Sequence, residues 1–288
     1  MNRTKKIVAY SLYVTGITVF FLYLLFPSDK IRTYTEHIVA ELSPGTTLNI
    51  EHINPTVPPG FRFTNASIRF EQETIVRFDH GRFVPSYRSM ISSRPTGNFS
   101  ASVGNGMIDG TISVHSEKDD RTLSSRIYLA AVDLGEIPIL NGLYPANVSG
   151  NLDGEIFYEA SMHQGVQLNG NGSAVFNIAG LRVSLDEDIL GINQFLFSSV
   201  KAEAQMENGH ISIKRLDMEG SQFSASGSGT LLVRDPIESS KIDLAGTIQL
   251  HPEIIRQFGA LIPRNYLEKG EVPVRITGTL AAPRYMLR

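Results

Sequence analysis

The residues best suited to chemistry in this sequence are its histidines, its grouped carboxylates and a serine-glycine cluster. Histidine and carboxylate groups bind metal ions and transfer protons, and an activated serine attacks carbonyl carbon. The seven histidines are scattered, and none has the His-Glu-x-x-His spacing of two ligands on one helix face. Asp186-Glu187-Asp188 is typical of a solvated turn or a helix start. The cluster 224–229 falls inside an alternating strand pattern, whereas a nucleophilic serine needs a strand-to-helix turn.

The composition excludes further classes of site. The chain has no cysteine, which removes disulfides, thiol nucleophiles and thiolate metal ligands together. A net charge of −3 and no run of lysine or arginine argue against nucleic-acid binding. No glycine-rich stretch leads into the Gly-Lys-Ser/Thr of a phosphate loop. We therefore predict a protein that is not an enzyme, with no catalytic, cofactor-binding or metal-binding residues and no cofactor.

An uncharged segment covers residues 7–26, and twelve of its twenty residues are Leu, Ile, Val or Phe. At about 1.5 Å rise per residue, a helix of this length reaches about 30 Å, the thickness of a bilayer's hydrocarbon core. We expect a single transmembrane helix that acts as a signal anchor. Its anchoring residues include Ile7, Leu12, Ile17, Phe21, Leu25 and Phe26.

The flanks of this segment predict its orientation. Arg3, Lys5 and Lys6 precede it, so the positive-inside rule places residues 1–6 in the cytoplasm and exports the rest. A cleaved secretory signal and a buried helix of a soluble protein are the alternatives. The sequence Phe26-Pro27-Ser28 lacks the small-residue pattern of a cleavage site, which favours an uncleaved anchor.

Residues 27–46 are expected to form a juxtamembrane helix and a linker. Ser28 or Asp29 caps this helix, and Pro44-Gly45 ends it. Apolar residues recur along it at helical spacing: Ile31, Tyr34, Ile38 and Leu42. This stripe either packs against the following domain, which we favour, or lies on the membrane surface.

From residue 47 to residue 288 the apolar period changes to two, which is typical of strands with one buried face. The predicted strands cover 48–53, 61–70, 74–84, 97–103, 106–116, 122–132, 146–158, 165–178, 195–207, 210–218, 221–233, 240–250 and 271–280. Short helices are expected at 134–143, 186–191 and 252–262. Tight turns are expected at Asn208-Gly209, His80-Gly81 and Asn105-Gly106.

Glycine recurs before alternating strand residues, as in the segments that begin at Gly106, Gly150, Gly227, Gly246 and Gly278. Glycine within strands marks bends, bulges or close approach of backbones, so its repetition predicts strong curvature. Chance similarity in a glycine-rich β protein is the alternative. The fold class is thus mainly β: one N-terminal transmembrane helix, then a curved, mostly antiparallel sheet with a few short helices.

The order of these features resembles two related groups of envelope proteins. Besides the anchor, the resemblance rests on the helix that ends at Leu42 with Pro44-Gly45-Thr46, and on the segments 132–138, 149–154, 208–213 and 220–229. One group is the type II secretion system protein N family, and the other is the broader AsmA-like set. The first resemblance implies a non-catalytic accessory or scaffold component of protein secretion, held in the inner membrane of a Gram-negative bacterium with its bulk in the periplasm. Its partners would be other inner-membrane secretion subunits or the secretin.

The AsmA-like resemblance implies instead a lipid-binding or lipid-transfer protein, with phospholipid held in an apolar β groove. An envelope enzyme or a glycan-binding module is a third reading. A curved open sheet also has edge strands that can pair with another chain. We place a candidate docking edge at the last predicted strand, over Arg275, Ile276, Thr277 and Gly278.

Overall fold

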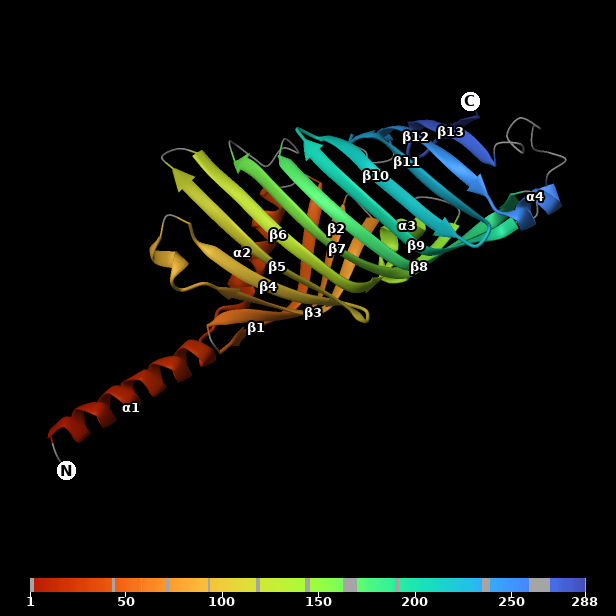
Figure 1. The fold of residues 1–288 in the computed structure, drawn as a ribbon. Helices are drawn as coiled ribbons and strands as arrows, with labels where there is room; N and C mark the ends of the chain where they lie inside the picture. Colours follow the sequence, from red (N-terminus) through yellow and green to blue (C-terminus); the bar gives the residue numbers. More distant parts are fainter. Residues whose placement is uncertain are drawn as a thin grey trace.

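The fold is a single antiparallel sheet of fourteen strands in the order β1 to β14, so every strand pairs with its neighbours in the sequence. The computed structural model describes residues 3–42, 45–57, 59–70, 73–92, 94–117, 120–142, 146–162, 170–189, 192–234, 239–258 and 270–287. Figure 1 shows a long, curved sheet from which the N-terminal helix projects. The predicted mainly β, antiparallel class is confirmed.

The strands are β1 (Thr46–Thr56), β2 (Gly60–Phe70), β3 (Glu73–Pro85), β4 (Thr96–Val103), β5 (Gly106–Glu117), β6 (Asp120–Asp133), β7 (Ala146–Met162), β8 (Asn171–Ile189), β9 (Ile192–Glu207), β10 (His210–Gly220), β11 (Phe223–Leu232), β12 (Lys241–Leu250), β13 (Glu271–Thr279) and β14 (Pro283–Leu287). The helices are α1 (Arg3–Leu24), α2 (Ser28–Leu42), α3 (Pro138–Gly142) and α4 (Pro252–Phe258), with 3-10 turns η1 (Ser89–Ile91) and η2 (Leu134–Glu136). Each of the thirteen predicted strands corresponds to one of β1 to β13.

The longest hairpin departs from prediction. β8 continues to Ile189, which pairs with Ile192 of β9, so the predicted helix at 186–191 is wrong over 186–189, and its last two residues lie outside the described part. An acidic run starts many helices, but here pairing with β9 outweighs that local preference. The predicted helix at 134–143 is present as η2 and α3, and that at 252–262 as α4; residues 143 and 259–262 are not described.

Two of the turn predictions have opposite outcomes. Asn208 and Gly209 have φ values of 51° and 80°, as the tight turn between β9 and β10 requires, so this prediction is confirmed. Gly81, in contrast, is buried inside β3, and the predicted turn there is wrong. A Cβ on Gly81 would lie 2.1 Å from the ring of Phe63 on β2, so this glycine makes room for an aromatic ring.

Helix α1 carries the residues that were expected to anchor the chain. Ile7, Leu12 and Phe21 are 60%, 69% and 49% exposed. Among the helices in the described ranges, none is long and apolar enough to cross a membrane, so the predicted transmembrane helix at 7–26 is not supported. Phe26 was assigned to the anchor, but it packs against the buried cluster of Ile50, Ile53 and Ala66, because the helix ends at Leu24.

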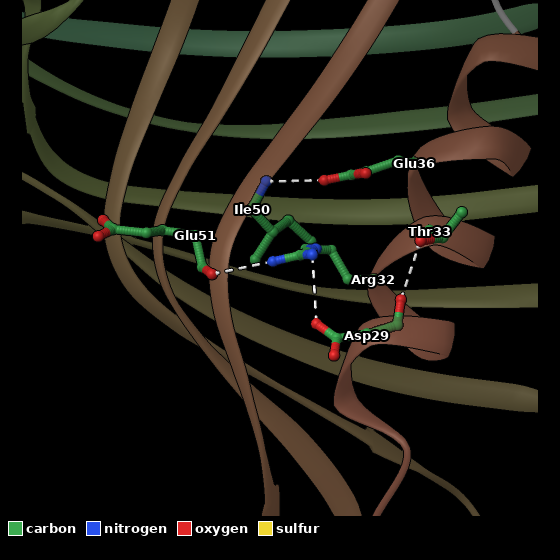
Figure 2. Close-up of polar contacts among 6 residues, drawn as sticks. All are labelled: Asp29, Arg32, Thr33, Glu36, Ile50 and Glu51. Carbon is green, nitrogen blue, oxygen red and sulfur yellow. Dashed lines mark hydrogen bonds and ion pairs between the residues drawn. The ribbon is translucent and has the colours of Figure 1, made fainter.

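Helix α2 confirms the predicted helix after residue 27, and it lies along the edge strand β1. Figure 2 shows its polar contacts with that strand. Glu36 Oε1 accepts the backbone N–H of Ile50 at 3.1 Å, and Arg32 Nη1 donates to the carbonyl of Glu51 at 3.4 Å. Ile31 packs against the cluster of Ile50 and its neighbours. The helix therefore covers a sheet edge that would otherwise be open.

The predicted docking edge does not lie at an edge. Arg275, Ile276, Thr277 and Gly278 belong to β13, which pairs with β12 on one side and with β14 on the other. Sequence reasoning missed β14, a strand of five residues after a tight turn. The outer strand at this end begins with Pro283, which has no N–H to offer a further chain.

Candidate functional site

The inner face of the sheet is the candidate site, because it is apolar across all fourteen strands. The register places one residue of each strand in a continuous row that contains no polar side chain. This row is Ile53, Phe63, Gly81, Ala101, Ile108, Leu129, Gly154, Phe176, Ala202, Leu216, Gly227, Gly246, Val274 and Leu287. Each strand thus contributes a side chain to one apolar stripe perpendicular to the strands.

A second row has the same character; it lies two residues along each strand except β10, where a register shift makes the step three residues. It comprises Pro55, Phe61, Phe83, Phe99, Gly110, Ile127, Ile156, Ala174, Ala204, Ile213, Gly229, Leu244, Ile276 and Tyr285. The tyrosine on the last strand carries the row's one polar group. Together the rows form an apolar band that runs from one edge of the sheet to the other.

The opposite face is polar. Its row between the two apolar rows reads Asn54, Arg62, Arg82, Ser100, Asp109, Tyr128, Glu155, Val175, Glu203 and Arg215 from β1 to β10. Ion pairs connect its strands: Arg126 with Glu155 at 3.5 Å, and Arg275 with Asp243 at 2.6 Å. This face is suited to water, so an apolar ligand has one face to bind.

One end of the inner face is filled by the chain itself. Leu134 of η2 is buried with Leu181, Phe197 and Val200, and Ile137 and Leu140 pack against this cluster. Helix α3 contacts both β3 and β7, so the sheet curls around it, as Figure 1 shows from the side. The inner face is therefore filled where η2 and α3 lie, next to the apolar band.

Beyond α3 the band is hollow. A hollow of about 530 Å³, part of it open to solvent, lies over β10 to β13. Ala225 and Gly227 of β11 and Gly246 of β12 form its floor, between Leu216 on one side and Val274 on the other. Ala225 and Gly227 occupy successive inward positions of β11. Because both residues are small, the floor lies below the flanking side chains. The part of it that a water-sized sphere can occupy is about 120 Å³, which is less than the roughly 300–1,000 Å³ of small-molecule sites.

A second hollow of about 620 Å³ adjoins it over β7 to β10. Its lining includes Ile156, Phe176, Ala204 and Ile211, and Ile211 is the next inward residue before Ile213 of the first hollow. Tyr158 also lines it, and burial raises the pKa of its phenol above the usual 10.0. The phenol therefore stays neutral at physiological pH, and the hollow contains no charge.

The inward side chains over these hollows are only half-buried. Ile213, Leu216, Leu244 and Phe176 all retain some exposure, although large apolar side chains on the inner face of a packed sheet are normally buried. An extended apolar surface of this kind on a protein marks a binding site. The half-exposed inner face is thus the feature that most needs a ligand.

Comparison with protein-family models, with curated proteins and with solved structures finds no match to this chain. The resemblance to the type II secretion protein N family and to AsmA-like proteins therefore stays a prediction. Within the described residues, no group of three or more His, Asp or Glu side chains is placed to hold a metal ion.

Of the residues singled out in the sequence, Ile276 lines the first hollow, whereas most of the others lie elsewhere. Ile7, Leu12, Ile17 and Phe21 are on α1, Phe26 packs against the cluster that includes Ile53, and Arg275 pairs with Asp243 on the polar face. The floor residues Ala225, Gly227 and Gly246 were assigned to strands, but not to a site. The sequence signal for this floor is a small residue at consecutive inward positions. A period of two shows which positions face inward, but it does not distinguish a hollow from ordinary packing.

Proposed function

We propose that this protein binds the acyl chains of a lipid along the inner face of its sheet. The observation that carries this proposal is the pair of apolar rows, which remain half-exposed over the two adjoining hollows. Both hollows are lined almost wholly by hydrocarbon, so they offer an apolar chain a dry surface and a polar ligand nothing to bond. A phospholipid, with two acyl chains and a headgroup left in water, meets both conditions.

We further propose that α1 attaches this groove to a membrane. Its large apolar side chains are exposed around the helix, and among them are Ile7, Leu12, Tyr13 and Leu24. A helix that is apolar on all sides is stable where it is surrounded by apolar material. Residues 1–6, with Arg3, Lys5 and Lys6, would stay on the cytoplasmic side, and the sheet would lie in the periplasm, in accord with the predicted orientation.

A pair of filling substitutions tests the groove. Ala204→Leu with Ala225→Leu adds side chains to both hollows, and we expect about tenfold less bound phospholipid, because the added side chains occupy the space that acyl chains would fill. The measurement is native mass spectrometry of the full chain after delipidation and re-exposure to phospholipid. Ala179→Leu is the matched control, since Ala179 is exposed on the polar face of β8.

Two outcomes would contradict the proposal. One is a folded, delipidated wild-type chain that never takes up phospholipid. The other is an equal loss of lipid in the Ala179→Leu control and in the filled variant. Circular dichroism of each variant separates loss of binding from loss of the sheet.

A role as accessory component of type II secretion is the second candidate, supported by the order of sequence motifs alone. It predicts that crosslinking in intact cells recovers inner-membrane secretion subunits or the secretin. Recovery of none of these, with normal secretion after deletion of the protein, would exclude it. The two roles are compatible, because the polar outer face remains available when the groove holds lipid.

A further inference from the structure

A second surface of the molecule combines exposed apolar side chains with arginine. It lies where the turn between β1 and β2 meets the connection between β3 and β4. Val57, Tyr87 and Ile91 are 76%, 43% and 94% exposed. Arg88 and Arg94 are exposed in the same connection. We call these five residues the basic tip.

The basic tip is held in place by hydrogen bonds between its two segments. Arg82 Nη2 donates to the carbonyl of Val57 at 3.3 Å, and the Tyr87 hydroxyl donates to the carbonyl of Pro59. The short turn η1 places Ile91 at its end. The apolar side chains are therefore presented outward by an ordered structure, although each would be more stable out of water.

The two chain segments that form the basic tip carry charge of one sign. The segments 52–70 and 80–108, which contain β2, β4 and both connections, include no Asp or Glu. Arg62 on β2 and Arg82 on β3 are paired across the two strands. Arg88 and Arg94 follow in the connection after β3. The tip thus offers positive charge with no acidic residue in either segment to offset it.

The basic tip is also close to the point where α1 leaves the body. Phe26 follows α1 and packs against the buried cluster that includes Ile53, three residues before Thr56 at the end of β1. Phe61, next to the turn on β2, packs against the same cluster. Figure 1 shows α1 meeting the body beside β1. A membrane that holds α1 would therefore lie next to the tip.

We propose that the basic tip docks on an anionic lipid surface. Val57, Tyr87 and Ile91 enter the region between headgroups and acyl chains, where aromatic and aliphatic side chains concentrate, and Arg88 and Arg94 face lipid phosphates. Three apolar side chains are too few for the core of a stable protein interface, but interfacial lipid binding combines small apolar contacts with positive charge. This docking does not depend on what the groove holds.

The test uses the absence of tryptophan from this chain. Ile91→Trp in the full chain gives a fluorophore at the tip alone. In vesicles of phosphatidylcholine with phosphatidylglycerol, we expect a blue-shifted emission that brominated acyl chains quench. Vesicles of phosphatidylcholine alone should give much less of both. Tyr128→Trp is the control, because Tyr128 is 47% exposed on the outer face of β6 and should stay in water.

Arg88→Ser with Arg94→Ser, made in the Ile91→Trp chain, should reduce the quenching to its level in phosphatidylcholine alone. Emission from Ile91→Trp that keeps its vesicle-free wavelength in both kinds of vesicle would overturn the proposal, whether or not the groove binds lipid. Equal quenching in both kinds would also overturn it. If the tip stays in water on both kinds of vesicle but is shielded in intact cells, its partner is a protein instead.

Discussion

Gly81→Val is expected to destabilise the sheet by about 3 kcal/mol, at the upper end of the cost of overpacking. A Cβ at this position would lie 2.1 Å from Phe63 Cζ and 2.7 Å from two further ring carbons. Gly81 is buried, and its strand is paired on both sides with β2 and β4. The ring therefore has no free volume to enter without moving a strand. Chemical denaturation of the full chain, followed by circular dichroism, measures the change.

A double-mutant cycle with Phe63→Ala is the control for this result. Phe63→Ala alone removes a ring that packs against Ile50 and its neighbours, and it should also be destabilising. If the ring is the obstacle, the two changes together should cost less than their sum by about 1 kcal/mol or more. Strict additivity would show that Gly81 is required for its backbone rather than for the room it leaves.

The same relation between glycine and an aromatic ring recurs across the sheet. Rings lie over glycines of the next strand at Gly97 with Phe83, Gly110 with Phe99 and Gly154 with Phe176. Glycine weakens a strand because it contributes no side chain, and a neighbouring ring that covers it restores part of the packing. The glycines that open the repeat in the sequence differ from these, because a Cβ at Gly106, Gly227 or Gly246 would first meet backbone atoms of a neighbouring strand.

This pattern shows how far the sequence could predict the structure. Alternation of apolar and polar residues places the strand residues on the correct faces. A register shift of one residue would exchange the two faces of the sheet. Thirteen strands were therefore predicted. The pairing of Phe63 with Gly81 depends on which strands are neighbours. One amino-acid sequence does not show this directly. The turn predicted at Gly81 failed for that reason, because glycine serves both turns and ring contacts.

The ends of the sheet were the least predictable part. An interior strand and an edge strand have the same period, so Arg275–Gly278 looked like an edge until β14 was placed beside it. At the other end, the sequence predicted α2 but not its position along β1. Glu36 and Ile50 meet through the tertiary fold, fourteen residues apart. The groove was likewise visible only as an expected apolar face, because alternation does not show which inward side chains stay uncovered.

Loss of the helix from β1 should open the sheet edge, and Glu36→Ala is the change that tests it. The N–H of Ile50 donates to Glu36 Oε1 at 3.1 Å, and Ile50 is 4% exposed. Removing the acceptor leaves this N–H without its partner near a buried side chain, at a cost of about 1–3 kcal/mol. We expect lower stability and, at high concentration, association through β1. Analytical ultracentrifugation of the full chain in detergent measures the association.

Two variants make the result specific. Glu36→Gln keeps an oxygen acceptor and should behave as the wild type, which separates the hydrogen bond from the charge of the carboxylate. Lys30→Ala changes an exposed residue of the same helix and should leave β1 covered. If Glu36→Ala remains as stable and as monodisperse as these two, then packing by Ile31 and Phe26 holds α2 in place without the polar contacts. The edge of a fourteen-stranded sheet would in that case be protected by apolar contact alone, and the contacts in Figure 2 would affect only the register of the helix.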